Sequence, residues 1–115
     1  MIIAMTRAKA RPRKQGELLQ TILSLLGPIR REKGCRACHS YLNLEDENDF
    51  ILVEEWDTQT DFETHASSEE YHVLLGALNV LCTPLEIRAK VFSATERPEA
   101  IEQAPDDVVG KGSAI

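Results

Sequence analysis

The chain has 115 residues, of which 43% are hydrophobic and 28% charged, and its net charge is −6. This length suits one domain with a single core and leaves no room for a separate cofactor domain. The acidic balance argues against a general nucleic-acid binder, which carries a basic surface. No apolar run approaches the roughly 20 residues that span a bilayer. We therefore expect neither a nucleic-acid nor a membrane partner.

Cysteine content and the first residues bear on where the protein resides. The chain has three cysteines, an odd number, and lacks export features, which favours a reducing compartment over a disulfide framework. Its apolar start, residues 1–5, is short for a signal peptide, and the positive charges follow that stretch instead of preceding it. We therefore expect a cytoplasmic protein.

The first two predicted elements are a strand and a helix. Residues 2–11 alternate with a period of two, which predicts a half-buried strand that ends before Pro12. Apolar residues over positions 16–33 recur at helical spacing, and Gly34 is a natural helix stop. Pro28 is a candidate kink or break in that helix.

A hairpin, a two-part helical stretch and a last strand follow. Residues 35–44 and 50–56 flank the polar loop 45–49, which predicts an antiparallel hairpin. Two patterns resembling capping boxes then open helical segments, Thr58 with Asp61 and Ser67 with Glu70. Pro84 ends the second segment, and residues 86–94 alternate as a fourth strand.

The order of these elements is β-α-β-β-α-β. It predicts an α+β, ferredoxin-like split β-α-β fold over residues 1–97, with helices on one face of a four-stranded antiparallel sheet. Residues 98–115 lack periodicity and mix Pro, Gly, Ala and acids. We expect them to form a mobile tail or, alternatively, to contact a partner subunit.

The strand over residues 50–56 is apolar on both of its faces. Ile51 and Val53 alternate with Leu52 and Trp56, so helices on one side of the sheet cover only one of these pairs. A monomer would expose the other pair as an apolar patch. We therefore expect a homodimer that packs its two open sheet faces together as a dimeric α/β barrel.

Several of these segments together resemble the antibiotic biosynthesis monooxygenase domain over roughly residues 1–95. The segments that carry the resemblance are Gly34-Cys35, the acidic hairpin loop, the strand Phe50-Ile51-Leu52-Val53-Glu54-Glu55-Trp56, His65-Ala66-Ser67-Ser68 and Tyr71. The resemblance implies a ferredoxin-like dimeric α/β barrel. It also implies one of several activities: cofactor-free oxidation of quinols or polycyclic phenols, haem degradation, or isomerisation of phosphorylated signalling sugars.

The candidate catalytic residues are Trp56, His65 and Tyr71, supported by Glu54 and Arg88. In a cofactor-free oxygenase, Trp56 would hold a planar phenol or quinol, His65 would take or shuttle its proton, and Tyr71 would hydrogen-bond a substrate oxygen. The structural alternative makes Trp56 a core residue, pairs Glu54 with Arg88 across the sheet, and packs His65 at a helix corner.

The segment Cys35-Arg36-Ala37-Cys38-His39 matches the C-x-x-C-H pattern of covalent haem attachment. In a regular strand Cys35 and Cys38 would point to opposite faces, which argues against haem, zinc and redox sites alike. No P-loop, G-x-S-x-G, HExxH or dinucleotide motif occurs. We therefore expect no cofactor and no metal.

Two other functions remain open. The same cleft could belong to a non-catalytic, small-molecule-binding or stress-related dimer. Alternatively, an isomerase of a phosphorylated carbonyl compound would use His65 as its base and the basic first strand for the phosphate. That strand carries four alternating cations, Arg7, Lys9, Arg11 and Arg13, for which a solvated face is the structural alternative.

Overall fold

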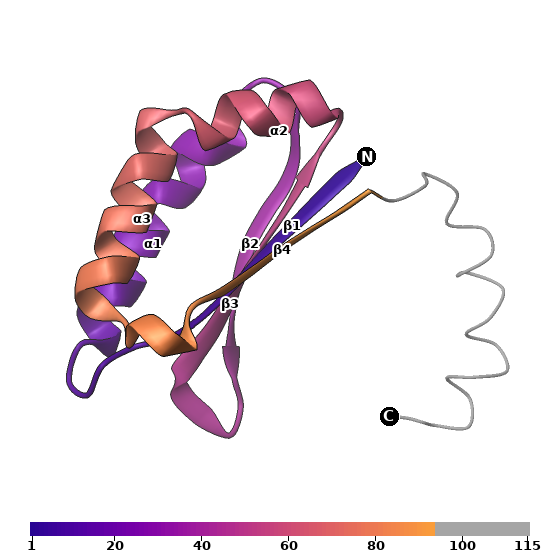
Figure 1. The fold of residues 1–115 in the computed structure, drawn as a ribbon. Helices are drawn as coiled ribbons and strands as arrows, with labels where there is room; N and C mark the ends of the chain where they lie inside the picture. Colours follow the sequence, from indigo (N-terminus) through magenta and orange to yellow (C-terminus); the bar gives the residue numbers. More distant parts are fainter. Residues whose placement is uncertain (94–115) are drawn as a thin grey trace, which may run out of the picture.

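The computed structural model describes residues 1–93, which fold into one antiparallel sheet with helices on a single face (Figure 1). The elements are β1 (Ile2–Lys9), α1 (Gln15–Arg30), β2 (Cys35–Asn43), β3 (Asp46–Trp56), α2 (Gln59–Ala66), α3 (Glu69–Leu81), a 3-10 turn (Pro84–Glu86) and β4 (Arg88–Ser93). The strand order is β2-β3-β1-β4. This confirms the predicted ferredoxin-like fold. The predicted tail, residues 98–115, lies outside the described residues.

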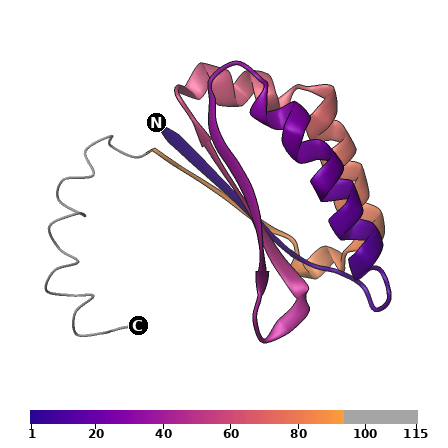
Figure 2. The same cartoon turned by 180° about the vertical axis from the view of Figure 1, so that it is seen from behind.

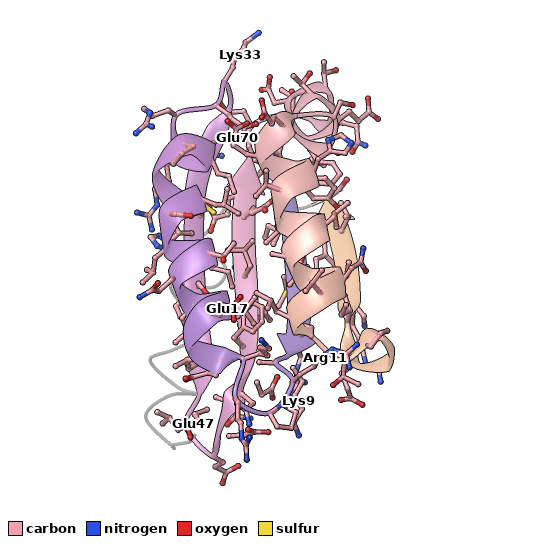
Figure 3. All side chains as sticks on the ribbon, turned by 90° about the vertical axis from the view of Figure 1, so that its left-hand side faces the viewer. Lys9, Arg11, Glu17, Lys33, Glu47 and Glu70 are labelled. Carbon is pink, nitrogen blue, oxygen red and sulfur yellow. The ribbon has the colours of Figure 1, made fainter. Side chains whose placement is uncertain are left out.

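The core lies between the sheet and the helices. Figure 2 shows α1 and α3 on the same side of the sheet, and Figure 3 shows them side by side. Their buried apolar residues are Leu18, Ile22, Leu25, Leu26 and Ile29 on α1 and Leu74, Leu78 and Leu81 on α3. These residues recur every three or four positions, so each helix presents one apolar stripe to the strands beneath it. No helix within residues 1–93 is long and apolar enough to cross a membrane.

The hairpin turn is tighter than the sequence predicted. The loop expected over residues 45–49 is wrong, because β3 already begins at Asp46. Asp49 pairs with Lys9 in the β1–β3 ladder, and the Lys9 Nζ lies 3.0 Å from an Asp46 carboxylate oxygen. Cross-strand partners of opposite charge therefore keep these polar residues in the sheet.

The helix ends follow the predicted caps with one shift. Thr58 Oγ1 accepts a hydrogen bond from the Asp61 backbone N–H over 3.0 Å, as its capping pattern predicted. The second cap is Ser68 and not Ser67, since Ser68 Oγ accepts from the Tyr71 N–H over 3.2 Å. Pro28 neither breaks nor ends α1, because it lies in the last turn of the helix.

A bulge at the start of β2 corrects the expected orientation of the two cysteines. Cys35 pairs with Trp56, whereas Cys38 pairs with Glu54, so the extra residue Arg36 brings both thiols to the helix-covered face. The prediction that they point to opposite faces is wrong for this reason. Both are free thiols, and burial raises the pKa of Cys38 to about 12, so its thiol stays protonated at neutral pH.

The other face of the sheet carries no helix (Figure 1). Strand pairing places Met5, Ile51, Val53 and Phe92 on this open face. Phe92 is 44% exposed. The double-sided apolar character predicted for β3 is therefore present: Leu52 and Trp56 are buried in the core, while the alternate residues face outward.

Candidate active site

His65 is the centre of a buried aromatic cluster. It lies in the last turn of α2, and its side chain has no exposed surface. Its ring stacks on Trp56 of β3 with the ring centroids 4.5 Å apart. The ring of Tyr71, in the first turn of α3, meets it edge-on at 5.2 Å. The break between α2 and α3 allows both helices to bring an aromatic ring to the same place.

Two carboxylates lie on opposite nitrogens of the His65 ring. The Nδ1 atom lies 3.0 and 3.2 Å from the two carboxylate oxygens of Glu32, in the turn after α1. The Nε2 atom lies 3.3 Å from Glu54 Oε1. That same oxygen accepts a hydrogen bond from the Trp56 indole N–H over 3.1 Å. Glu54 and Trp56 are two residues apart on β3, so both side chains point into the core.

The electrostatics of the cluster favour a charged imidazole. Burial by itself opposes that charge, but the adjacent Glu54 and Glu32 carboxylates outweigh it, and the pKa of His65 is raised above 6.5. Burial also raises the pKa of Glu32, although the neighbouring His65 offsets part of this effect. The pKa of Tyr71 is raised by burial and by the charge of Glu54, so its hydroxyl stays protonated.

The Nε2 atom of His65 is a buried polar atom whose hydrogen-bonding capacity is unused. It is close to Glu54 Oε1, yet the alignment is too poor for a hydrogen bond, and no other partner among residues 1–93 reaches it. Buried polar groups are rarely left unpaired, because each costs about 1–3 kcal/mol. The unused Nε2 makes His65 the candidate group for proton transfer in this cluster.

The cluster is closed in this conformation. Trp56 is 0% exposed and His65 is 1% exposed, so no molecule in solution can touch either ring. Surface hollows do occur beside other residues, including one on the open face near Met5, Arg88 and Phe92. The hollow near Met5, Arg88 and Phe92 lies on the open face of the sheet, whereas the His65 cluster lies on the face that the helices cover.

Arg88 is the one predicted site residue that does not join the cluster. It pairs with Arg7 across β4 and β1, and β1 lies between β4 and β3 in the sheet. Its side chain is on the open face, whereas Glu54 points into the core. Arg88 therefore does not support the cluster as predicted, and the Glu54–Arg88 pair of the structural alternative does not form. The two strands are not neighbours, and the side chains lie on opposite faces.

Glu32 is the functional candidate that the sequence analysis missed. It precedes the helix stop Gly34 and is 33 positions from its partner His65, so no local pattern connects them. The basic first strand is also less available than its sequence suggested. Arg7 and Lys9 are paired with Asp49 and Asp46, which leaves fewer free cations for a phosphate.

The described residues, 1–93, offer no metal site. Within residues 1–93, no three His, Cys, Asp or Glu side chains are grouped so that they could hold a metal ion. Glu32 and Glu54 contact different nitrogens of the His65 ring, which therefore separates the two carboxylates.

Comparison with known proteins assigns the chain to a family. Its residues 1–75 match the antibiotic biosynthesis monooxygenase family. The chain belongs to this family. The match spans β1 to the first half of α3, so it includes every residue of the His65 cluster. No curated protein matches the chain in sequence.

Solved structures of similar proteins have the same fold. A candidate antibiotic biosynthesis monooxygenase from Deinococcus radiodurans is 22% identical, covers 84% of this chain and 95% of its own, and superposes with a TM-score of 0.77. The protein Rv0793 from Mycobacterium tuberculosis is 20% identical, covers 84% of this chain and 96% of its own, and has a TM-score of 0.75. At this identity the likeness establishes the fold alone.

Proposed function

We propose that this member of the family is a cofactor-free monooxygenase that oxidises a small quinol or phenol with molecular oxygen. The observation that carries the proposal is His65, buried between two carboxylates, stacked on Trp56, and left with an unused Nε2. Membership of the antibiotic biosynthesis monooxygenase family supports the oxygenase class.

The substrate itself supplies the electrons. A phenol or quinol with an unsubstituted ring carbon ortho or para to a hydroxyl group reacts with one O₂ to give one water and a quinone, which is a hydroxyquinone when the substrate is a quinol. One oxygen atom forms the new bond to the ring carbon, the O–O bond breaks, and the other oxygen takes the hydroxyl and ring hydrogens as water. The four electrons that reduce O₂ all come from the ring, so the protein has to supply only binding, a base and a dry site.

Each residue of the cluster has a part in this step. The Trp56 ring stacks on the imidazole and holds it in place, and the neutral form of His65 takes the hydroxyl proton at Nε2 before returning it to the departing oxygen. The Tyr71 hydroxyl donates a hydrogen bond to a substrate oxygen. Glu54 holds the Trp56 indole in place through the hydrogen bond between them. The burial of Trp56 and His65 keeps water away from the reacting groups.

Oxygen consumption tests this proposal. The purified protein would be given a panel of benzoquinols, naphthoquinols and naphthols with no added cofactor or metal. We expect uptake with at least one compound and a loss of about 100-fold or more in His65→Gln, because a positioned base contributes on the order of 10²–10⁴. His72→Gln is the matched control, since His72 is an exposed histidine on α3.

Two results would contradict the proposal. The first is the absence of uptake across the panel, and the second is uptake that His65→Gln leaves unchanged. If the compounds bind without reacting, the non-catalytic binding function weighed from the sequence takes its place.

We further propose that the protein is a homodimer through the open sheet face. Met5, Ile51, Val53 and Phe92 would otherwise leave apolar side chains facing water. Light scattering at micromolar concentration should give twice the 12.9 kDa chain mass. A mass of 12.9 kDa would refute this assembly, whereas Ile51→Lys should convert a dimer into that species.

A further inference from the structure

We propose that Glu32 is a positioning residue, which holds the proton of His65 on Nδ1 and thereby presents Nε2 as the base. This inference rests on the proposed function and adds a residue to it. Both Glu32 oxygens lie within 3.2 Å of Nδ1. An ionised carboxylate only accepts hydrogen bonds, so the Nδ1 atom facing it must carry the proton. In the neutral ring the lone pair is then on Nε2.

The backbone of the turn holds Glu32 in place. The Glu32 N–H donates to the Ile29 carbonyl over 3.0 Å, and the Glu32 carbonyl accepts from the Cys35 N–H over 3.1 Å. Gly34 follows with a φ of 85°, and its carbonyl accepts from the Asp57 N–H over 2.8 Å. These hydrogen bonds connect the turn to the end of α1 and to β3. They therefore fix the direction from which the Glu32 carboxylate contacts His65.

The packing of α2 against this turn also fixes the position of Glu32 relative to His65. A Cβ atom at Gly34 would collide with the side chain of Asp61, so α2 approaches the turn as closely as a glycine permits. His65 is on the same helix, four residues after Asp61. One close contact thus sets the distance between the helix that carries the imidazole and the turn that carries Glu32.

Glu54 and Glu32 make different contacts with the His65 ring. Glu54 Oε1 already accepts the Trp56 indole N–H and is poorly aligned with Nε2, so a substrate oxygen can take its place beside that nitrogen. Glu32 contacts Nδ1 with both oxygens and has no second side-chain partner among the hydrogen bonds of residues 1–93. It is also partly exposed, at 17% of its side chain, whereas Glu54 is 4% exposed.

The remaining titratable groups around the cluster are neutral or outside it. Tyr71 on α3 faces the His65 ring, and Cys35 on β2 lies near both carboxylates. Burial raises the pKa of each of these two groups. The charge of Glu54 raises both values further, and that of Glu32 adds to the effect on Cys35. Glu70 of α3 lies at the same end of the helices as the turn (Figure 3), and its charge raises the pKa of Glu32. Glu32 and Glu54 are therefore the charges that govern the His65 ring.

Histidine titration by ¹⁵N NMR tests the inference without turnover. In the wild type we expect the neutral His65 ring to be the Nδ1–H tautomer and its pKa to lie above 6.5. Glu32→Gln removes the charge and keeps an amide of similar size, so the pKa of His65 should fall by about one unit or more. Glu63→Gln is the matched control, because it removes one charge from an exposed position on α2 and should leave the titration unchanged.

Kinetics supply the second readout. In Glu32→Gln, kcat should fall by about tenfold or more while KM changes little, because Glu32 touches His65 and not the substrate. The acid limb of the kcat–pH profile should move to lower pH together with the NMR titration. In Glu63→Gln both should match the wild type.

The possible outcomes distinguish a failure of the positioning role of Glu32 from a failure of the proposed oxygenase function on which it rests. If Glu32→Gln leaves the tautomer and pKa of His65 unchanged, or if it changes KM instead of kcat, the positioning role is overturned even where oxygen uptake is found. If the titration moves as expected but no substrate is oxidised by the wild type, the proposed function fails and the control of the His65 ring by Glu32 is supported.

Discussion

Two polar clusters in the same molecule differ in how completely their groups are paired. At the hairpin end, Arg7 contacts both carboxylate oxygens of Asp49, at 3.1 and 2.7 Å, and Asn43 donates to Asp49 over 3.0 Å. That Arg7 side chain is 61% exposed. In the interior, the His65 side chain has no exposed surface, and its Nε2 atom lies 3.3 Å from Glu54 without an aligned hydrogen bond. The rim cluster of Arg7, Asn43 and Asp49 therefore stabilises the hairpin through aligned hydrogen bonds, whereas the interior cluster keeps one buried nitrogen without such a bond.

The clusters also respond to pH in opposite directions. Hydrogen bonds from Arg7 and Asn43 lower the pKa of Asp49. The pKa of His65 is raised, because Glu54 and Glu32 outweigh its burial. The rim cluster therefore loses stability in acid, whereas the His65 cluster loses it as the pH rises.

The largest difference between core and surface should appear on truncating large side chains. Trp56→Ala removes a side chain with no exposed surface and should lower the free energy of unfolding by about 3–5 kcal/mol. Leu23→Ala, at a residue of α1 that is 65% exposed, should change it by no more than about 0.5 kcal/mol. Urea titrations measure both variants. Equal losses in the two would contradict the placement of Trp56 in the core.

The second-largest loss of stability is expected on changing the turn that positions Glu32. Gly34→Ala forces a Cβ atom into Asp61 at a positive φ, so we expect a loss of about 1–3 kcal/mol. Gly76→Ala is the control, because a Cβ atom at that position in α3 meets nothing within 4 Å. It should stabilise the helix by about 0.5–1 kcal/mol. Opposite signs in thermal or urea unfolding would confirm that Gly34 is structurally required.

The pH dependence of stability should reveal the charge on His65. The folded protein binds the His65 proton more tightly than the unfolded chain, so this contribution is complete below pH 6.5 and is lost as the pH rises through the raised pKa. The slope is at most about 1.4 kcal/mol per pH unit. Unfolding curves between pH 6 and 9 should show this decline in the wild type and in His72→Gln. In His65→Gln the free energy of unfolding should decline less over this pH range. A decline equal to that of the wild type would refute the assignment of the pH dependence to His65.

The smallest effect on stability is expected at Asp49, in the rim cluster at the hairpin end. The stabilising contribution of Asp49 is present above its unfolded pKa of 3.8 and is lost as the pH falls through its lowered folded pKa. Asp49→Asn should therefore be less stable than the wild type at pH 7, by less than Gly34→Ala, and equal to it in strong acid. Glu47→Gln, at an exposed hairpin position, should match the wild type throughout. A deficit in Asp49→Asn that persists in strong acid would contradict the charge-based explanation.

Most of the fold could be predicted because its determinants are local. Alternation in residues 2–11, the apolar stripe of α1 and the Thr58 cap each depend on neighbours within a few positions. The same local rule placed Glu54 and Trp56 on one face of β3. It failed at the bulge in β2, because one added residue, Arg36, reverses the orientation of everything after it.

The sequence by itself therefore determined the order of the elements and their apolar faces, whereas the contact of His65 with Trp56 and Tyr71 depends on the packing of α2 and α3 against β3. Only the tertiary structure decided that Glu32 holds His65 and that Arg88 is on the other side of the sheet. The physical reason is the range of the interactions. Helical and strand periodicity is set between residues a few positions apart, whereas a carboxylate meets an imidazole 33 residues away only when strand order and helix packing bring them together.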